Sequence, residues 1–121
     1  MANTFKVITF AAEPASAGTA YKMYTVAGST TTVVLGLILT NIHSSAVTVE
    51  VELVSDTGSR GGNNDVTNTT SFLVKDVTIP AGSSLELLSG GKVVLETGDK
   101  IQIDCSVADK ISGTLSIMEI S

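Results

Sequence analysis

The stretch "STTTVVLGLILTN" (Ser29–Asn41) decides how this chain folds. Its central seven residues, Val33 to Leu39, carry no polar side chain. That run is far shorter than the ~20 residues that a helix needs to cross a bilayer. It also lacks the alternation of a strand that has one solvated face. The run therefore predicts a strand that is covered on both sides.

A strand of this kind needs other residues packed against each of its two faces. In a two-layer sandwich only one face of each sheet meets the core. Burying a second row of Val and Ile is worth about 1.5–3 kcal/mol per residue, provided that something lies over it. The N-terminal strand or the Ala-rich connector after it could supply that cover, and so could another subunit, which we favour. Extended geometry predicts Val33, Leu35, Leu37 and Leu39 on one face, and Val34, Gly36 and Ile38 on the other.

The rest of the chain predicts strands as well. It has 121 residues, of which 43% are hydrophobic and only 16% charged, against about 25% charged in average domains. Segments of period two recur between turn residues, and "AVTVEVELVS" (46–55) is the clearest strand with one solvated face. We expect one all-β domain, an antiparallel β-sandwich of about eight strands with jelly-roll or immunoglobulin-like topology. Residues 1–19 are expected to form an N-terminal strand or arm followed by a connector.

Both ends of the chain repeat the two-sided apolar pattern. The N-terminal "TFKVITF" and the C-terminal "LSIMEI" each place apolar side chains on both faces of a strand. Such surfaces are an aggregation liability unless a partner covers them. We therefore predict an interface between subunits, formed by the following residues: Phe5, Val7, Ile8, Phe10, Val34, Ile38, Met118 and Ile120.

Catalytic and metal-binding patterns are missing from the sequence. The single His43 and the single Cys105 lie about sixty positions apart, which predicts neither a nucleophilic triad nor a metal cluster. We expect His43 to be a surface corner residue and Cys105 a buried core residue, because Cys105 is in phase with Ile101 and Ile103. The sequence predicts no enzyme activity, no cofactor and no metal.

The polar stretch from Asp56 to Thr70 predicts a long exposed loop. Its oxygen-bearing residues could bind calcium, but their spacing fits no known loop motif, and a flexible polar tip is favoured. Asn68 begins a glycosylation sequon, which carries little weight because "MANTFKVITF" is unlike a signal peptide. The loop could also serve a receptor- or glycan-binding module, although the shortage of aromatic residues disfavours this function.

The net charge of −5 makes nucleic acid an improbable partner, because phosphate backbones repel an acidic protein. The sequence also predicts no segment that spans a membrane, so we expect no membrane partner. We expect the protein to be made in a reducing compartment.

Four segments resemble a family of small virion structural proteins of tailed bacteriophages, especially phages of marine cyanobacteria. They are "MANTFK", "YTVAGSTTTVVLGLILTNI", "VTIPAGSSLELLSGGKVVLETGDKIQI" and "LSIMEIS". The resemblance implies a compact β-domain present in many copies on a virion that is assembled in the host cytoplasm. It leaves the location in the virion open.

Within that family, a capsid decoration or cement protein is the first expectation. Its partners would be its own copies, bound through the apolar second faces around a local threefold axis in a trimer or in another homo-oligomer, and the major capsid protein, on which an N-terminal arm would sit. A tail, neck, baseplate or fibre-associated subunit is the alternative.

Overall fold

The computed structural model describes residues 2–55, 68–88 and 90–121. Within them the chain forms nine strands and no helix, so the predicted all-β sandwich is confirmed. No helix in these ranges is long and apolar enough to span a membrane. The strands are β1 (Asn3–Glu13), β2 (Tyr21–Thr25), β3 (Thr31–Asn41), β4 (Val47–Val54), β5 (Ser71–Ile79), β6 (Ser84–Leu87), β7 (Val93–Leu95), β8 (Lys100–Cys105) and β9 (Ile111–Ile120).

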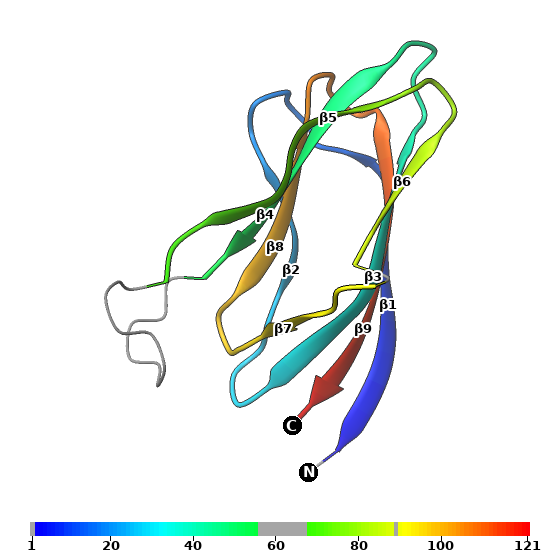
Figure 1. Cartoon of the computed structure of the whole chain (residues 1–121). Helices are drawn as coiled ribbons and strands as arrows, with labels where there is room; N and C mark the ends of the chain where they lie inside the picture. The colour runs from blue at the N-terminus through cyan, green and yellow to red at the C-terminus, as the bar shows by residue number, and fades with distance from the viewer. Residues whose placement is uncertain (1, 56–67, 89) are drawn as a thin grey trace.

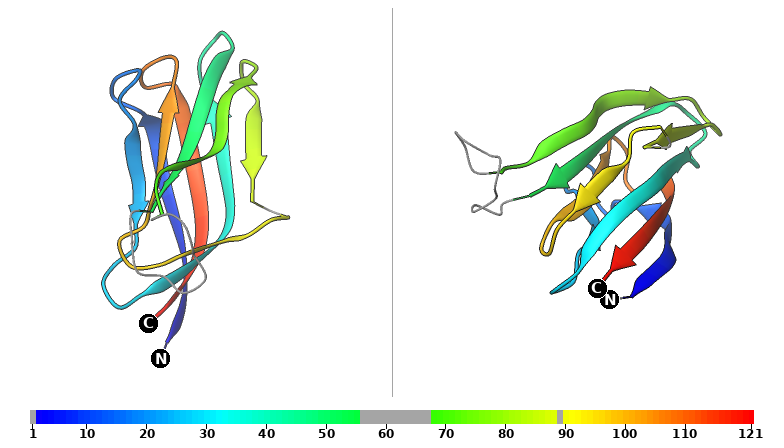
Figure 2. Two further views of the ribbon diagram at one scale, coloured as in Figure 1. Left: turned by 60° about the vertical axis from the view of Figure 1, so that its left-hand side comes forward. Right: turned by 60° about the horizontal axis from the view of Figure 1, so that its bottom comes forward.

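Two antiparallel sheets face each other (Figures 1 and 2). The first has the order β1-β9-β3-β6, with β7 paired to the other half of β3, and the second has the order β2-β8-β4-β5. The pairs β1–β9, β2–β8, β3–β6 and β4–β5 are those of one long antiparallel ribbon folded over on itself. This is the jelly-roll arrangement, so of the two predicted topologies the jelly roll is the one that forms.

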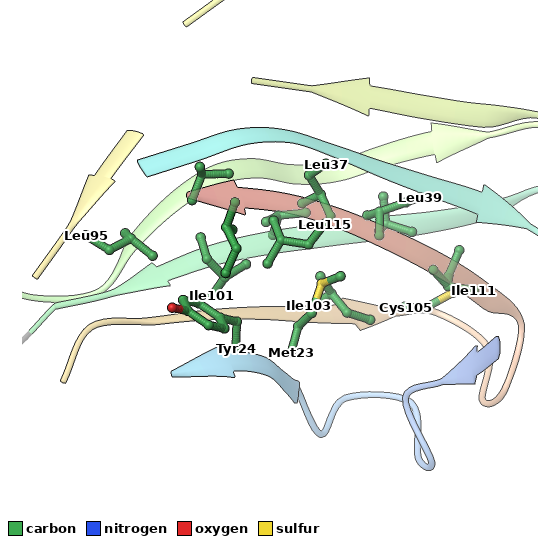
Figure 3. Packing of buried hydrophobic residues seen from close by; sticks show 14 of the residues in the cluster. Met23, Tyr24, Leu37, Leu39, Leu95, Ile101, Ile103, Cys105, Ile111 and Leu115 are labelled. Carbon is green, nitrogen blue, oxygen red and sulfur yellow. The ribbon is translucent and has the colours of Figure 1, made fainter. Parts of the chain in front are cut away.

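The core lies between the sheets and consists mainly of aliphatic side chains (Figure 3). Val47, Val49 and Val51 of β4 are buried in it, while Thr48 and Glu50 face outwards. The predicted alternation of this strand is therefore confirmed. Cys105 is buried in the same core, as its phase with Ile101 and Ile103 predicts.

The opening stretch forms β3, but with a break in its alternation. The pairing of β3 with β9 shifts between Val34 and Gly36, which is a β-bulge at Leu35. Before the bulge Val34 points into the core, and after it Leu37 and Leu39 do. The prediction that Val33 and Leu37 share one face is therefore wrong, because one extra residue moves the side chains beyond it to the other face.

Candidate assembly surface

Four apolar side chains form a row across the outer face of the first sheet. Phe5 lies directly opposite Met118, Met118 opposite Val33, and Val33 opposite Val94. Directly opposed residues project from the same face of an antiparallel sheet. Phe5 at one end of the row is 71% exposed and Val94 at the other is 61% exposed, and the two between them are half-buried. The row thus crosses four strands, β1, β9, β3 and β7.

Apart from Glu86, the described strand residues in the remainder of this outer face are apolar or carry hydroxyl or amide groups. Val7 and Ile38 are exposed on it, and Ile120 is half-buried. Serine and threonine fill most other positions of β9, β3 and β6. Among the described strand residues of this face only Glu86, opposite Ile38 on β6, is charged.

The bulge at Leu35 shapes a hollow in the same face. The hollow has a volume of about 270 Å³ and is lined by residues of β3, β6 and β9. Gly36 contributes no side chain there, and Ser116 and Thr114 of β9 are small. Ile38 and Glu86 form part of its wall. A neighbouring protein could therefore insert a side chain beside the apolar row.

The outer face of the second sheet has the opposite character. Glu50 lies opposite Asp104, and Glu52 opposite Gln102. Lys75 Nζ lies 3.1 Å from Glu50 Oε1, and this hydrogen bond is the main reason why the pKa of Lys75 is raised. Lys22, opposite Gln102, and Lys100, opposite Thr25, project from the same face. This face, called the acidic face below after Glu50, Glu52 and Asp104, therefore carries charges of both signs, and charged side chains on a strand face keep their hydration by facing solvent.

A second hollow, of about 190 Å³, lies on the acidic face, with Glu50, Asp76 and Asp104 in its lining. Asp104 Oδ1 accepts hydrogen bonds from the amides of Gly18, at 3.1 Å, and Cys105, at 2.8 Å. Within the described part of the chain, no group of three or more His, Cys, Asp or Glu side chains is placed to hold a metal ion. This hollow is therefore a cleft between partnered carboxylates.

The predicted interface residues divide into two sets. Phe5, Val7 and Ile38 are exposed on the outer face of the first sheet, where Met118 and Ile120 are half-buried beside them. The other three residues predicted for the interface point inwards: Val34 is fully buried in the core, and Ile8 and Phe10 pack against it.

Val34 is therefore a correction to the predicted interface: the bulge turns it towards the core. The surface also contains Val33 and Val94, which the sequence did not single out. The sequence gives no signal for Val94, because "KVVLE" has three consecutive apolar residues and no alternation. The position of Val33 opposite Val94 follows only from the fold.

Of the remaining predicted features, His43 and Asn68 lie outside the strands that form this surface. His43 is half-buried at the corner after β3, where its amide donates a hydrogen bond of 2.7 Å to Asn41 Oδ1. Asn68 donates a hydrogen bond of 3.2 Å to Ser55 Oγ. Most of the predicted loop from Asp56 to Thr70, and with it the calcium alternative, lies outside the described residues.

Comparison with protein-family models, curated proteins and solved structures finds no match to this chain. Its function is argued below from its own geometry.

Proposed function

We propose that this protein is a non-enzymatic structural subunit of a bacteriophage virion, and specifically a capsid decoration protein that oligomerises on the shell and stabilises it. One observation carries the proposal: the two outer faces of the sandwich differ in chemistry. One face presents the apolar row from Phe5 to Val94 and a single peripheral carboxylate. The other face presents charged side chains, with Glu50 opposite Asp104 and lysines beside them.

The apolar face has the size of a protein interface. Strands lie about 4.8 Å apart and rise about 3.3 Å per residue, so four strands of about ten residues cover roughly 20 by 30 Å. A stable interface buries about 800 Å² on each partner, which is comparable with this area. Contiguous exposed apolar patches on soluble proteins mark sites of protein contact. The shell is the partner that the proposal assigns to this face.

The contrast in charge would orient the subunit. With a net charge of −5, two copies or two coated particles repel each other overall. A subunit that places its apolar face on the shell turns Glu50, Glu52 and Asp104 towards solvent. Particles coated in this way resist clumping, while the contacts added across neighbouring capsid proteins strengthen the shell.

The fold and the sequence resemblance support the same function. Jelly rolls recur in viral capsid proteins, although lectin domains and cupins share them, so the fold alone does not identify a function. The four resembling segments include β3 and the part of β9 from Leu115 to Ile120, the two central strands of the proposed surface.

The test is binding to shells that lack this protein. Purified protein should bind them at a fixed stoichiometry and raise the temperature at which they break. The double variant Val94→Ser, Ile38→Ser should bind weakly, whereas Glu52→Ser, on the acidic face, should bind like the native protein. Failure of the native protein to bind, or equal binding by both variants, would remove the proposal. A copy number of six to a few dozen per virion, instead of hundreds, would assign the protein to the tail.

A further inference from the structure

Strand β1 is an edge strand with a free set of backbone groups. Among the described residues it pairs along its length only with β9. The amide of Ala2 donates to Ser121 O at 2.9 Å, and the amide of Ser121 donates to Ala2 O at 3.0 Å. Ala2 and Ser121 are therefore a hydrogen-bonded pair, and such pairs alternate with non-bonded pairs along an antiparallel ladder.

The alternation identifies which groups of β1 are free. The register continues without a shift from Asn3, opposite Ile120, to Phe10, opposite Gly113. Even-numbered residues such as Lys6 therefore bond to β9. The odd-numbered residues Asn3, Phe5, Val7 and Thr9 direct their N–H and C=O groups to the open edge. Two of these four are the exposed apolar residues Phe5 and Val7.

This end of β1 is accessible from every side except that of β9. All residues from Asn3 to Val7 are exposed, whichever face they occupy, and in Figure 1 the start of β1 runs beside the end of β9, away from the second sheet. Proteins usually protect such an edge with charge, proline or a covering segment. Between Asn3 and Thr9 the only charged residue is Lys6, whose Nζ lies 2.7 Å from Glu119 Oε1 on β9.

We propose that the open edge of β1 pairs antiparallel with β1 of a second copy of this chain, with Lys6 at the twofold axis. Phe5 then lies opposite Val7 of the second copy, and Asn3 opposite Thr9. These are the residues with free backbone groups, so the pairing satisfies all of them in both copies. The inference deepens the proposed function and rests on it for its setting in the virion: the two apolar faces join into one continuous face.

The side chains select this register over its neighbours. A shift that centres the axis on Val7 places Phe5 opposite Thr9, and a shift that centres it on Phe5 places Val7 opposite Asn3. Only the Lys6-centred register matches apolar with apolar and polar with polar side chains on the outer face. It opposes Lys6 to Lys6, which is unfavourable, but the Glu119 carboxylate beside each lysine offsets that repulsion.

The charge distribution favours a second copy as the partner. The chain carries twelve Asp and Glu residues and a net charge of −5, so most approaches of two copies are repulsive. The strand from Asn3 to Ala12 contains no carboxylate and one lysine. Two copies that meet at this edge keep their acidic faces apart.

Cysteine cross-linking tests the register directly. In the proposed pair, the two Lys6 residues form a non-bonded pair with Cα atoms about 4.5 Å apart, within the range that a disulfide spans. Lys6→Cys should therefore form a disulfide dimer rapidly under mild oxidation. Thr4→Cys, equally exposed on the same strand, faces Ile8 of the second copy and should cross-link at least about tenfold more slowly. Cys105 is buried and does not compete. Equal rates for the two variants would overturn the proposal.

Proline at an odd position tests the edge without breaking the sheet. The amide of Val7 points to the open edge, so Val7→Pro removes no bond to β9 and is tolerated there. Sedimentation equilibrium of the native protein should show a mass that rises with concentration towards twice 12.4 kDa. Val7→Pro should weaken this dimer at least about tenfold, while Val94→Ser, at the opposite edge of the sheet, should leave it unchanged.

Two outcomes of the sedimentation experiment would also overturn the proposal: a native protein that stays monomeric at all concentrations, or equal weakening of the dimer by Val7→Pro and Val94→Ser. The proposed function can fail independently of this inference. A native protein that dimerises through β1 but binds no shell would retain the inference and remove the proposed function. A native protein that binds shells but stays monomeric in solution would retain the function and remove the inference.

Discussion

The hydroxyl of Tyr24, on β2, donates a 2.6 Å hydrogen bond to Glu119, on β9, and so links the two sheets at one end of the sandwich. The same hydroxyl shares a 2.7 Å hydrogen bond with Thr32 Oγ1. Lys6 contacts the other oxygen of the carboxylate. Burial, and then the bond to Glu119, raises the pKa of Tyr24 to about 12, while Lys6 and Tyr24 lower the pKa of Glu119.

Tyr24→Phe should destabilise the protein by about 1–2 kcal/mol at neutral pH, because the carboxylate and Thr32 lose a partner. The difference in stability between the native protein and Tyr24→Phe should narrow at alkaline pH and then reverse. Free tyrosine ionises near pH 10, so above that pH the unfolded native chain loses a proton that the folded chain keeps up to about 12. Stability of the native protein therefore falls across this interval, by up to about 2–3 kcal/mol. Urea unfolding of the native protein and of Tyr24→Phe at several pH values measures the two free energies of unfolding. A difference between them that does not change with pH would contradict this account.

Val34 and Ile38, four positions apart on β3, should respond very differently to truncation. Val34→Ala removes a fully buried side chain and should cost about 2–3 kcal/mol. Ile38 is 41% exposed, so Ile38→Ala should cost less than about 1 kcal/mol. Denaturant unfolding of the two variants compares them. Similar losses would show that β3 lacks the bulge at Leu35.

Gly113 makes room for the ring of Phe10, its partner on β1. A Cβ at Gly113 would overlap ring carbons of Phe10, and that ring packs edge-on against Tyr21 with centroids 5.0 Å apart. Gly113→Ala should therefore cost about 1–3 kcal/mol, and Phe10→Leu in the same chain should recover part of it. Gly36→Ala is the matched control, because its Cβ would meet only Leu87 O at 4.0 Å. Thermal unfolding compares the melting temperatures of Gly113→Ala and Gly36→Ala. Equal losses in the two variants would refute this packing.

Asn41 closes β3 with a buried side chain that needs both its donor and its acceptor. Its Nδ2 donates to the carbonyls of Ser45 and Ile79, each at 2.9 Å, and the side chain is 1% exposed. Asn41→Asp turns a carboxylate towards those two carbonyls and should cost about 3 kcal/mol or more at neutral pH. The pKa of the new carboxyl should be raised, so part of the stability should return as pH falls. A loss independent of pH would argue against this placement.

Much of the architecture could be predicted from the sequence, because local alternation survives in the fold. The strand from Val47 to Val54 and the burial of Cys105 follow from a period of two. The bulge at Leu35 could not be predicted: all seven residues around it are apolar, so both registers bury similar side chains. Only the pairing of β3 with β6, β7 and β9 determines which of the two registers forms.

The candidate surface could be predicted only in part, because the sequence does not show the bulge in β3. Phe5, Val7 and Ile38 are exposed as expected. Because of the bulge, Val33 lies on the outer face in place of Val34, which points into the core. Val94 belongs to the surface because β7 pairs with half of β3, a contact between positions about sixty residues apart in the chain. Such non-local pairing leaves little trace in a single sequence.

The most direct measurement of the central claim is hydrogen–deuterium exchange of this protein, free and assembled on particles. We predict that assembly protects peptides of β1, β9 and β3, with β7 beside them, and leaves the acidic face of β4 and β5 exchanging as in the free protein. Protection centred on Glu50 and Glu52, with the strands around Phe5 and Met118 unchanged, would contradict the account.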